Sequence, residues 1–302
     1  HAYGGSGADS ESFRKSPMKI PLFFNNTARS ARAGRFRRWL KRYGSVFDVM
    51  EPESSEDMLN RLAAQARSGA PAVAVAGGDG TLRLAARALC NTDTALALFP
   101  AGTANVFSRE MGFRQNFHHA LHVLKTGRTR EVDLFAFNGQ PFLQMAGIGA
   151  DGRSVELTTW EMKKKWKAFA YVIAGARAFT ERQPLLTLTA DDGRVLEGRS
   201  IIFGNGRRYG GPMKLFAEAN NEDGLLDAVV FKHAAPSIIR ESLLALVHGG
   251  FHSLRYGGFE YVRMTEGQVA AIGHAACELD GDYAGDAPVQ ITRAGKLKVF
   301  AP

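Results

Sequence analysis

The chain is poor in cysteine, and it lacks the signatures of several protein classes. Its 302 residues include two cysteines, which provide neither a disulfide framework nor a zinc-ligand spacing. No apolar run approaches the roughly 18 residues of a membrane span, and we expect no secretory signal. No GxxxxGK[ST] phosphate loop occurs. These absences argue against a disulfide scaffold, a zinc domain, a membrane-spanning protein and a P-loop NTPase.

The charge balance favours an anionic partner. The formal net charge is +8, which suits a nucleotide, a nucleic acid or an acidic membrane surface. We expect no nucleic-acid partner, because the basic residues form no strand platform interleaved with aromatic residues. Residues 1–17 precede Met18, and we interpret them as a disordered tail or cloning remnant.

One glycine-rich stretch organises the rest of the sequence. The apolar run 73–76 leads into Gly77-Gly78-Asp79-Gly80-Thr81 and then into a helix. Glycines let a ligand approach the backbone, and a helix N-terminus attracts phosphate. Asp79 would repel phosphate unless a metal ion lies between them or the carboxylate takes a proton. The stretch therefore predicts a nucleotide site, although a tight turn with a capping Asp explains it equally well.

A second glycine turn ends the next expected strand, at 95–99. It reads Pro100-Ala101-Gly102-Thr103-Ala104-Asn105. Ligands of open α/β sheets bind at the carboxyl ends of the strands, so two such turns on successive strands can wall one crevice.

Together the two turns resemble the nucleotide site of the diacylglycerol kinase catalytic-domain family. That family includes bacterial soluble lipid kinases and sphingosine kinases, and it is related to NAD kinases. The resemblance spans about 18–302 and implies ATP and Mg2+ as cofactors. The nucleotide contacts that it implies are Asn25, Gly77, Gly78, Asp79, Gly80, Thr81, Gly102, Thr103 and Asn105. Val106 departs from the family, since many relatives have Asp there.

The secondary-structure pattern changes near residue 128. Strands alternate with helices before it, and short strands dominate after it. We expect a parallel-sheet α/β nucleotide-binding domain at 18–128 and an antiparallel β-sandwich domain for the lipid substrate at 129–293. The resemblance adds that a strand at about 294–302 can return to the first domain. Helices are expected at about 153–182 and 236–248.

Two motifs in the second half are candidates for the acceptor site. The segment 147–152 matches GxGxxG, but no second strand with a terminal acid follows, so a dinucleotide site is disfavoured. The resemblance instead places Asp151 near the acceptor hydroxyl. Asp280-Gly281-Asp282 stands where relatives carry Asp-Gly-Glu, whose Glu is the proposed general base. Asp282 would take that role with a shorter side chain, and a simple hairpin turn is the alternative.

Two loops of the second half have open interpretations. The loop 205–211 is similar to the N-x-x-x-Y-G-G segment of the family, and by itself it is either a surface loop or an anion-binding loop. In bacterial relatives the acidic turn matching 221–225 holds a structural Mg2+, which implies Asp223 as a ligand. A plain β-turn explains this turn equally well.

The segment 160–171 combines a lysine cluster with two of the three tryptophans. Basic residues beside interfacial aromatics suit docking on an anionic bilayer. A helix packed on the sandwich with solvated lysines is nearly as good an explanation.

We expect an ATP- and Mg2+-dependent lipid kinase that transfers the γ-phosphate of ATP to a lipid hydroxyl. The most favoured acceptor is diacylglycerol, whose product would be phosphatidic acid. Asp282, Asp79 and Asp151 are the expected catalytic residues. The alternatives are a kinase of a sphingoid base, phosphatidylglycerol or NAD, or a catalytically weak nucleotide-binding regulator. A membrane lipid substrate implies a cytoplasmic protein bound peripherally to an anionic membrane surface, and a homodimer is one option for its assembly.

Overall fold

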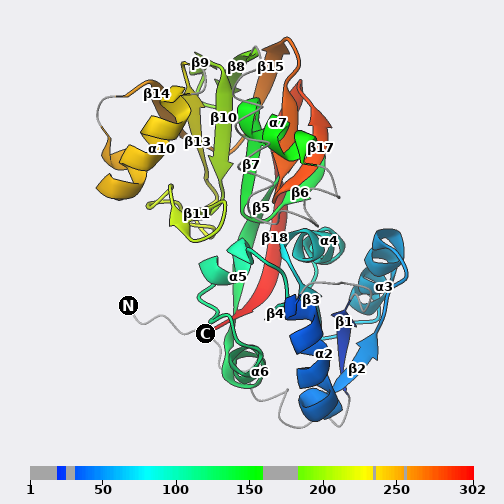
Figure 1. The fold of residues 1–302 in the computed structure, drawn as a ribbon. Coiled ribbons are helices and arrows are strands. Elements are labelled where there is room, and N and C mark those ends of the chain that lie inside the picture. Colours follow the sequence, from blue (N-terminus) through cyan, green and yellow to red (C-terminus); the bar gives the residue numbers. More distant parts are fainter. Residues whose placement is uncertain (1–18, 25–30, 159–182, 234–235, 255–256) are drawn as a thin grey trace, which may run out of the picture. The chain divides into compact units, whose positions relative to one another are not determined.

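The computed structural model describes residues 19–24, 31–158, 183–233, 236–254 and 257–302. Asn25 and the segment 160–171 with its lysines and tryptophans lie outside these ranges, as do the first 18 residues and most of the helix expected at 153–182. The chain divides into two compact units, which are described separately (Figure 1). The first unit comprises the chain up to Glu131 together with Leu297–Pro302, and the second unit is Val132–Lys296.

The N-terminal unit is built on a parallel sheet. Its strand order is β2 (Phe47–Met50), β1 (Ile20–Phe24), β3 (Ala72–Gly77) and β4 (Ala95–Pro100), and Val299 of β18 (Val289–Ala301) pairs with β4. The unit also contains α2 (Ala31–Tyr43), η1 (Gly44–Val46), α3 (Ser55–Arg67), α4 (Asp79–Leu89), α5 (Val106–Glu110) and α6 (Phe117–Thr126). β4 is buried along its whole length. A parallel strand buried in this way reads as a continuous apolar run, as 95–99 does.

Aromatic packing fixes α2 against this sheet. The ring of Phe36 lies 5.0 Å from that of Phe24 and 5.8 Å from that of Phe99. The apolar stripe of the helix passes through Phe36 and Trp39, both of which are buried. Leu40, which follows Trp39, is only half-buried.

The C-terminal unit is an antiparallel β-sandwich. One sheet has the order β6 (Gln140–Phe142), β5 (Arg128–Phe137), β18, β15 (Gly267–Ile272), β8 (Leu185–Ala190) and β9 (Val195–Gly198). The other has the order β14 (Phe259–Met264), β13 (Leu226–Phe231), β10 (Ser200–Gly204), β7 (Met145–Ile148), β16 (Ala276–Leu279) and β17 (Asp282–Asp286). Alternate side chains of both sheets meet in one apolar core, as expected for face-to-face packing.

Short elements complete this unit, namely α7 (Ala150–Leu157), the hairpin of β11 (Arg208–Tyr209) and β12 (Met213–Lys214), α10 (Pro236–His248) and η2 (Phe251–Ser253). The last strand, β18, runs without a break from Val289 to Ala301. The fold class expected from the sequence, a parallel α/β part followed by an antiparallel β part, is confirmed. None of the helices in the described ranges is long and apolar enough to span a membrane.

Candidate functional site

In the N-terminal unit the two glycine turns lie side by side. β3 and β4 pair in register up to Gly77 and Pro100, and the N–H of Gly102 donates to the carbonyl of Gly77 at 3.1 Å. A Cβ atom added at Gly102 would collide with the Cα of Gly78, and one added at Gly77 would collide with the side chain of Thr81. Glycine is therefore required at 102 for the two turns to approach each other, and at 77 for Thr81 to pack against its own turn. Bare backbone and the N-terminus of α4 meet at the carboxyl ends of two parallel strands, where ligands of such sheets bind.

Asp79 is the first residue of α4, and its carboxylate reaches the start of a different helix. Its Oδ1 accepts a hydrogen bond from the backbone N–H of Phe107 in α5, at 3.1 Å. Burial raises the pKa of the carboxyl, while the backbone N–H groups around Asn105, Val106 and Phe107 oppose that rise. A capping Asp was one interpretation of this turn, and the helix that it caps is α5.

Asn105 closes the second turn from within. Its side chain is fully buried, and its backbone has the left-handed φ of 49°. The amide Oδ1 accepts from the N–H of Gly102 at 2.9 Å, and Nδ2 donates to Gly102 O and to Gln115 Oε1. Asn105 therefore shapes the turn, whereas Thr103 is exposed beside it and Thr81 is partly exposed. Their contacts with a nucleotide stay predictions.

In the C-terminal unit three ionisable side chains meet at one hydroxyl group. The Tyr209 hydroxyl is within hydrogen-bonding distance of Asp151 Oδ2, of Glu278 Oε1 at 3.3 Å and of the Ala146 carbonyl at 3.2 Å. Glu278 is 1% exposed. One hydroxyl proton serves one acceptor at a time, so a proton on either carboxyl would add a hydrogen bond to this cluster.

The pKa values of this acid cluster, Asp151 with Tyr209 and Glu278, favour such a proton. Burial raises the pKa of Asp151 against the hydrogen bonds of its two neighbours, which lower it. Burial and then the negative charge of Asp151 raise the pKa of Glu278 well above its ordinary value. The pKa of Tyr209 is also raised, first by burial, so the phenol stays protonated. Both carboxyls are therefore harder to ionise than a free carboxyl, and a proton can pass between them.

The GxGxxG motif at 147–152 has a packing explanation. A Cβ atom at Gly147 would collide with the Asp151 carboxylate, and one at Gly152 would collide with the carbonyl of Ala276 in β16. Gly149 has a φ of 89° and donates its N–H to that same carbonyl at 3.0 Å. The three glycines thus seat α7 on β16 and bring Asp151 to the acid cluster.

The hairpin of β16 and β17 separates two acids that are close in sequence. Its turn residues Asp280 and Gly281 have φ values of 52° and 87°, as a two-residue hairpin with Asp-Gly requires. Glu278 pairs with Tyr283, and Leu279 pairs with Asp282. Because successive side chains alternate between faces, Glu278 lies on the face toward Asp151 and Asp282 lies on the other. The roles expected for Asp282 and Asp151 stay predictions, and Glu278 is a candidate that the sequence motifs missed.

Asp280 and Asn205 fix the backbone around the acid cluster. The Asp280 carboxylate accepts from the N–H groups of Leu143, Gln144 and Met145, at 2.8, 2.9 and 3.2 Å. The buried Asn205 donates from Nδ2 to the carbonyls of Asp133 and Leu143. The loop that begins at Asn205 is therefore tied to the sandwich, and it carries Tyr209 to the acids.

The acidic turn with Asp223 does not fit a bound divalent cation as it stands. Asp223 Oδ1 accepts from the N–H of Leu225 at 3.0 Å, and Oδ2 accepts from Arg263 Nη2 at 2.5 Å. Arg263 Nε also lies 3.5 Å from the buried Asp227. Across the described ranges, no three His, Cys, Asp or Glu side chains are grouped to hold a metal. The magnesium role of Asp223 stays a prediction, and no step below depends on it.

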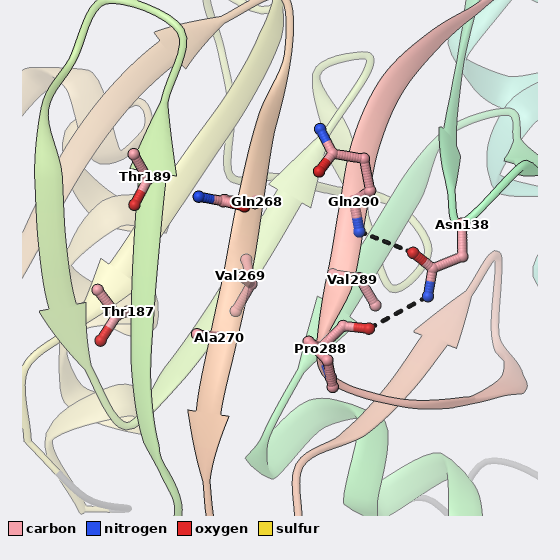
Figure 2. Close-up of a pocket in the computed structure, with 9 residues that line it drawn as sticks. All are labelled: Asn138, Thr187, Thr189, Gln268, Val269, Ala270, Pro288, Val289 and Gln290. Atoms are coloured by element: carbon pink, nitrogen blue, oxygen red, sulfur yellow. Dashed lines mark hydrogen bonds between the residues drawn. The ribbon is translucent and has the colours of Figure 1, made fainter.

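A pocket of about 360 Å³ lies elsewhere in the C-terminal unit and is lined by residues of β8, β15 and β18 (Figure 2). Asn138 holds its wall together, since Nδ2 donates to Pro288 O and Oδ1 accepts from the N–H of Gln290. The other lining residues are Thr187, Thr189, Gln268, Val269, Ala270 and Val289. This lining has no ionisable side chain and none of the expected site residues, so the pocket lacks the groups for proton transfer.

Comparison with known proteins assigns both halves of the chain. Residues 19–137 match the family described as the diacylglycerol kinase catalytic domain, and residues 145–301 match the YegS C-terminal NAD kinase beta sandwich-like domain. The "Probable lipid kinase YegS-like" protein of Pseudomonas putida is 33% identical over 70% of this chain and 72% of its own. A "Diacylglycerol kinase" of Mycobacterium tuberculosis is 28% identical over 93% of each chain.

The fold has a solved counterpart. The crystal structure of a diacylglycerol kinase from Bacillus anthracis superposes with a TM-score of 0.76 at 22% identity, over 94% of this chain and 97% of that one. From its YegS C-terminal domain and its YegS-like relatives, the chain belongs to the family of YegS-like lipid kinases that carry a diacylglycerol kinase catalytic domain.

Proposed function

We propose that the protein is an ATP- and Mg2+-dependent lipid kinase that transfers the γ-phosphoryl group of MgATP to a lipid hydroxyl. Diacylglycerol is the first candidate acceptor, and phosphatidic acid would be the product. The observation that supports this most strongly is the pair of interlocked glycine turns at the carboxyl ends of β3 and β4, in a chain of this kinase family. Phosphoryl transfer depends mainly on positioning and charge neutralisation, which backbone N–H groups and a helix N-terminus supply.

The N-terminal unit would bind the nucleotide. Gly77, Gly78, Gly80 and Gly102 would admit the phosphates to the backbone, and Thr81 and Thr103 would add polar contacts. Asp79 would act on the phosphates through the magnesium of MgATP. Asn25 would also contact the nucleotide, as the family resemblance implies.

The C-terminal unit would accept the proton of the lipid hydroxyl. In this step the proton passes to the carboxylate of Asp151 or Glu278, the hydroxyl oxygen forms a bond to the γ-phosphorus, and the bond from that phosphorus to the leaving ADP oxygen breaks. A carboxyl with a raised pKa is, once ionised, a stronger base than an ordinary carboxylate. Asp282 is the competing candidate for this base.

A transfer assay tests this function. Radiolabelled ATP is offered with mixed micelles of diacylglycerol, phosphatidylglycerol, ceramide or sphingosine, and separately with soluble NAD. We expect label in diacylglycerol, and little label in the Asp79→Asn and Glu278→Gln variants. The matched control is Asp192→Asn, which removes an exposed carboxylate from the hairpin turn between β8 and β9. Label in NAD alone would replace the lipid acceptor, and ATP binding without transfer to any acceptor would favour a nucleotide-binding regulator.

Asp282→Asn separates the two candidate bases in the same assay. If Asp282 is the base, this variant loses transfer and Glu278→Gln retains it. If the acid cluster is the base, the outcome is reversed.

We also propose that the protein works at the cytoplasmic face of a membrane, bound peripherally to an anionic lipid surface. The net charge of +8 supports this, because a lipid acceptor has to be reached in its bilayer.

A further inference from the structure

Helix α10 has its apolar side turned outward. The residues on its inner side are Ile238, Glu241 and Ala245, which are buried and spaced as one helical stripe. The outer side carries large apolar residues: Ile239, Leu243, Leu244, Leu246 and Val247. Leu243 is 58% exposed and Val247 is 80% exposed. A surface helix of a globular protein normally shows the opposite arrangement.

These apolar residues form a patch. Among the described residues, ten large hydrophobic side chains are exposed, and five of them lie on this one helix. Singly exposed apolar residues are ordinary, whereas a contiguous group marks a surface that binds a protein or a membrane.

The orientation of α10 is fixed by polar contacts on its inner side. Glu241 is 1% exposed, and its Oε1 accepts hydrogen bonds from Gly258 N at 3.2 Å and from Arg240 Nη2 at 2.6 Å. Rotating the helix to bury the leucines would bring this carboxylate into solvent and break its contact with the loop at 257–258. The outward apolar face is therefore built into the fold.

The rim of the patch is basic. On α10 itself Arg240 and His248 are exposed, while the acidic residue of the helix is buried inside. The chain after α10 contacts the β11–β12 hairpin, since Phe251 N–H donates to Leu215 O at 3.0 Å. That hairpin, beside α10 in Figure 1, adds the exposed Met213 and Lys214. Glu218 lies nearby and is paired with His252 at 3.2 Å.

We propose that the apolar face of α10 and the tip of the β11–β12 hairpin form the surface by which this protein docks on an anionic lipid bilayer. Leu243 and Val247 would enter the boundary between headgroups and acyl chains, and Arg240 and Lys214 would contact lipid phosphates. A second copy of the chain fits less well, because its basic rim would face an identical basic rim. The same hairpin carries Tyr209 of the acid cluster, which links the docking surface to the proposed acceptor site. This inference rests on the proposed lipid-kinase function.

Co-sedimentation with vesicles tests the docking surface. The vesicles contain phosphatidylglycerol and phosphatidylcholine, and the variant is Leu243→Gln combined with Val247→Gln. The matched control is Val195→Gln combined with Ile272→Gln, which removes side chains that are 60% and 75% exposed on β9 and β15. We expect the α10 variant to lose at least about tenfold in vesicle affinity and the control to bind like the wild type. Equal binding by all three proteins would overturn the proposal.

Transfer to a short-chain diacylglycerol, dissolved as monomers, separates docking from catalysis. We expect the α10 variant to keep this activity and to lose transfer to long-chain diacylglycerol in vesicles. Equal losses on both acceptors would indicate damage to the fold and overturn the proposal. A wild-type dimer that becomes monomeric in the variant, without a change in vesicle affinity, would assign the face to a second copy. If the α10 variant alone loses vesicle binding and the wild type phosphorylates no lipid, the docking surface is retained and the proposed function is refuted.

Discussion

The C-terminal unit contains two pairs of neighbouring carboxyls that lie in different surroundings. Asp151 and Glu278 face each other across the Tyr209 hydroxyl, and burial raises the pKa of both. Asp223 and Asp227 are instead bridged by the guanidinium group of Arg263. Burial favours the protonated form in the first pair, whereas the second pair lies against a fixed cation.

Because of this difference, the pair Asp151 and Glu278 is suited to catalysis, whereas the pair Asp223 and Asp227 is suited to stabilising the fold. A carboxyl that carries a proton near neutral pH can release it and take it back during a reaction. A guanidinium stays charged at every accessible pH and offers only donors, so it holds its partners without exchanging protons with them. We therefore expect substitutions in the acid cluster to change rate and substitutions around Arg263 to change stability.

The largest expected effect is on catalysis, in the variants Glu278→Gln and Asp151→Asn. Each amide keeps the size of the side chain but cannot accept the proton of the acceptor hydroxyl. Removing a general base typically costs about a hundred- to ten-thousand-fold in rate. We expect losses in this range in kcat for lipid phosphorylation, measured with saturating ATP.

The stability of the same variants is the control for that prediction. An amide removes the repulsion between the two carboxyls, so the melting temperature should stay equal or rise. A variant with normal kcat and a lower melting temperature would assign the acid cluster a structural role and remove the contrast with Arg263.

The second effect is on stability, in Arg263→Met. This variant removes the guanidinium and leaves two acids close together, one of them buried. Breaking such a pair destabilises by several kcal/mol, and protonation of Asp227 relieves part of it, so we expect a loss of roughly 2–3 kcal/mol in the free energy of unfolding. Chemical denaturation at pH 7 measures it, with Arg263→Lys as the charge-retaining control.

Magnesium sharpens the same comparison. We expect a chelator to leave the melting temperature of the nucleotide-free wild type unchanged, because Arg263 already supplies the positive charge at this turn. Added Mg2+ should stabilise Arg263→Met more than the wild type. A wild type that loses several degrees on chelation would instead support a structural metal at Asp223.

The sequence predicts the fold class and the nucleotide turns because their signals are local. The glycines at 77, 78 and 102 are read directly from the chain, and the contacts that require them come from residues nearby or on the next strand. The hairpin turn at 191–193 between β8 and β9 is also local, since an Asp-Gly pair with Gly193 at a φ of 84° is typical of such turns.

The acid cluster could not be predicted in the same way, because its members come from three distant segments. Tyr209 is 58 residues from Asp151 and 69 residues from Glu278. Only the strand register decides that Glu278, rather than Asp282, lies on the face toward Asp151. An available signal was the acidic Glu278 within the apolar run 275–279, since a buried acid needs a partner. The pairing of Arg263 with Asp223 depends in the same way on the packing of β13 and β14.

The last expected effect is a pH slope that belongs to Asp227. Burial raises the pKa of this carboxyl to about 7, although Arg263 opposes the rise. Between its unfolded pKa near 4 and this folded value, the folded state binds more protons than the unfolded state. The free energy of unfolding therefore falls as the pH rises, by at most about 1.4 kcal/mol per pH unit, and the decline ends above pH 7.

Asp227→Asn should remove this contribution. Denaturation from pH 5 to pH 8 should show the variant gaining on the wild type up to about pH 7 and running parallel above it. Asp192→Asn should give a parallel curve throughout, because Arg194 lowers the pKa of that exposed carboxyl below this range. A slope that remains in Asp227→Asn belongs to other raised acids, Asp151 and Glu278 foremost. Parallel curves for Asp227→Asn and the wild type would mean that Arg263 keeps Asp227 ionised, and that both acids of this turn are neutralised by the same cation.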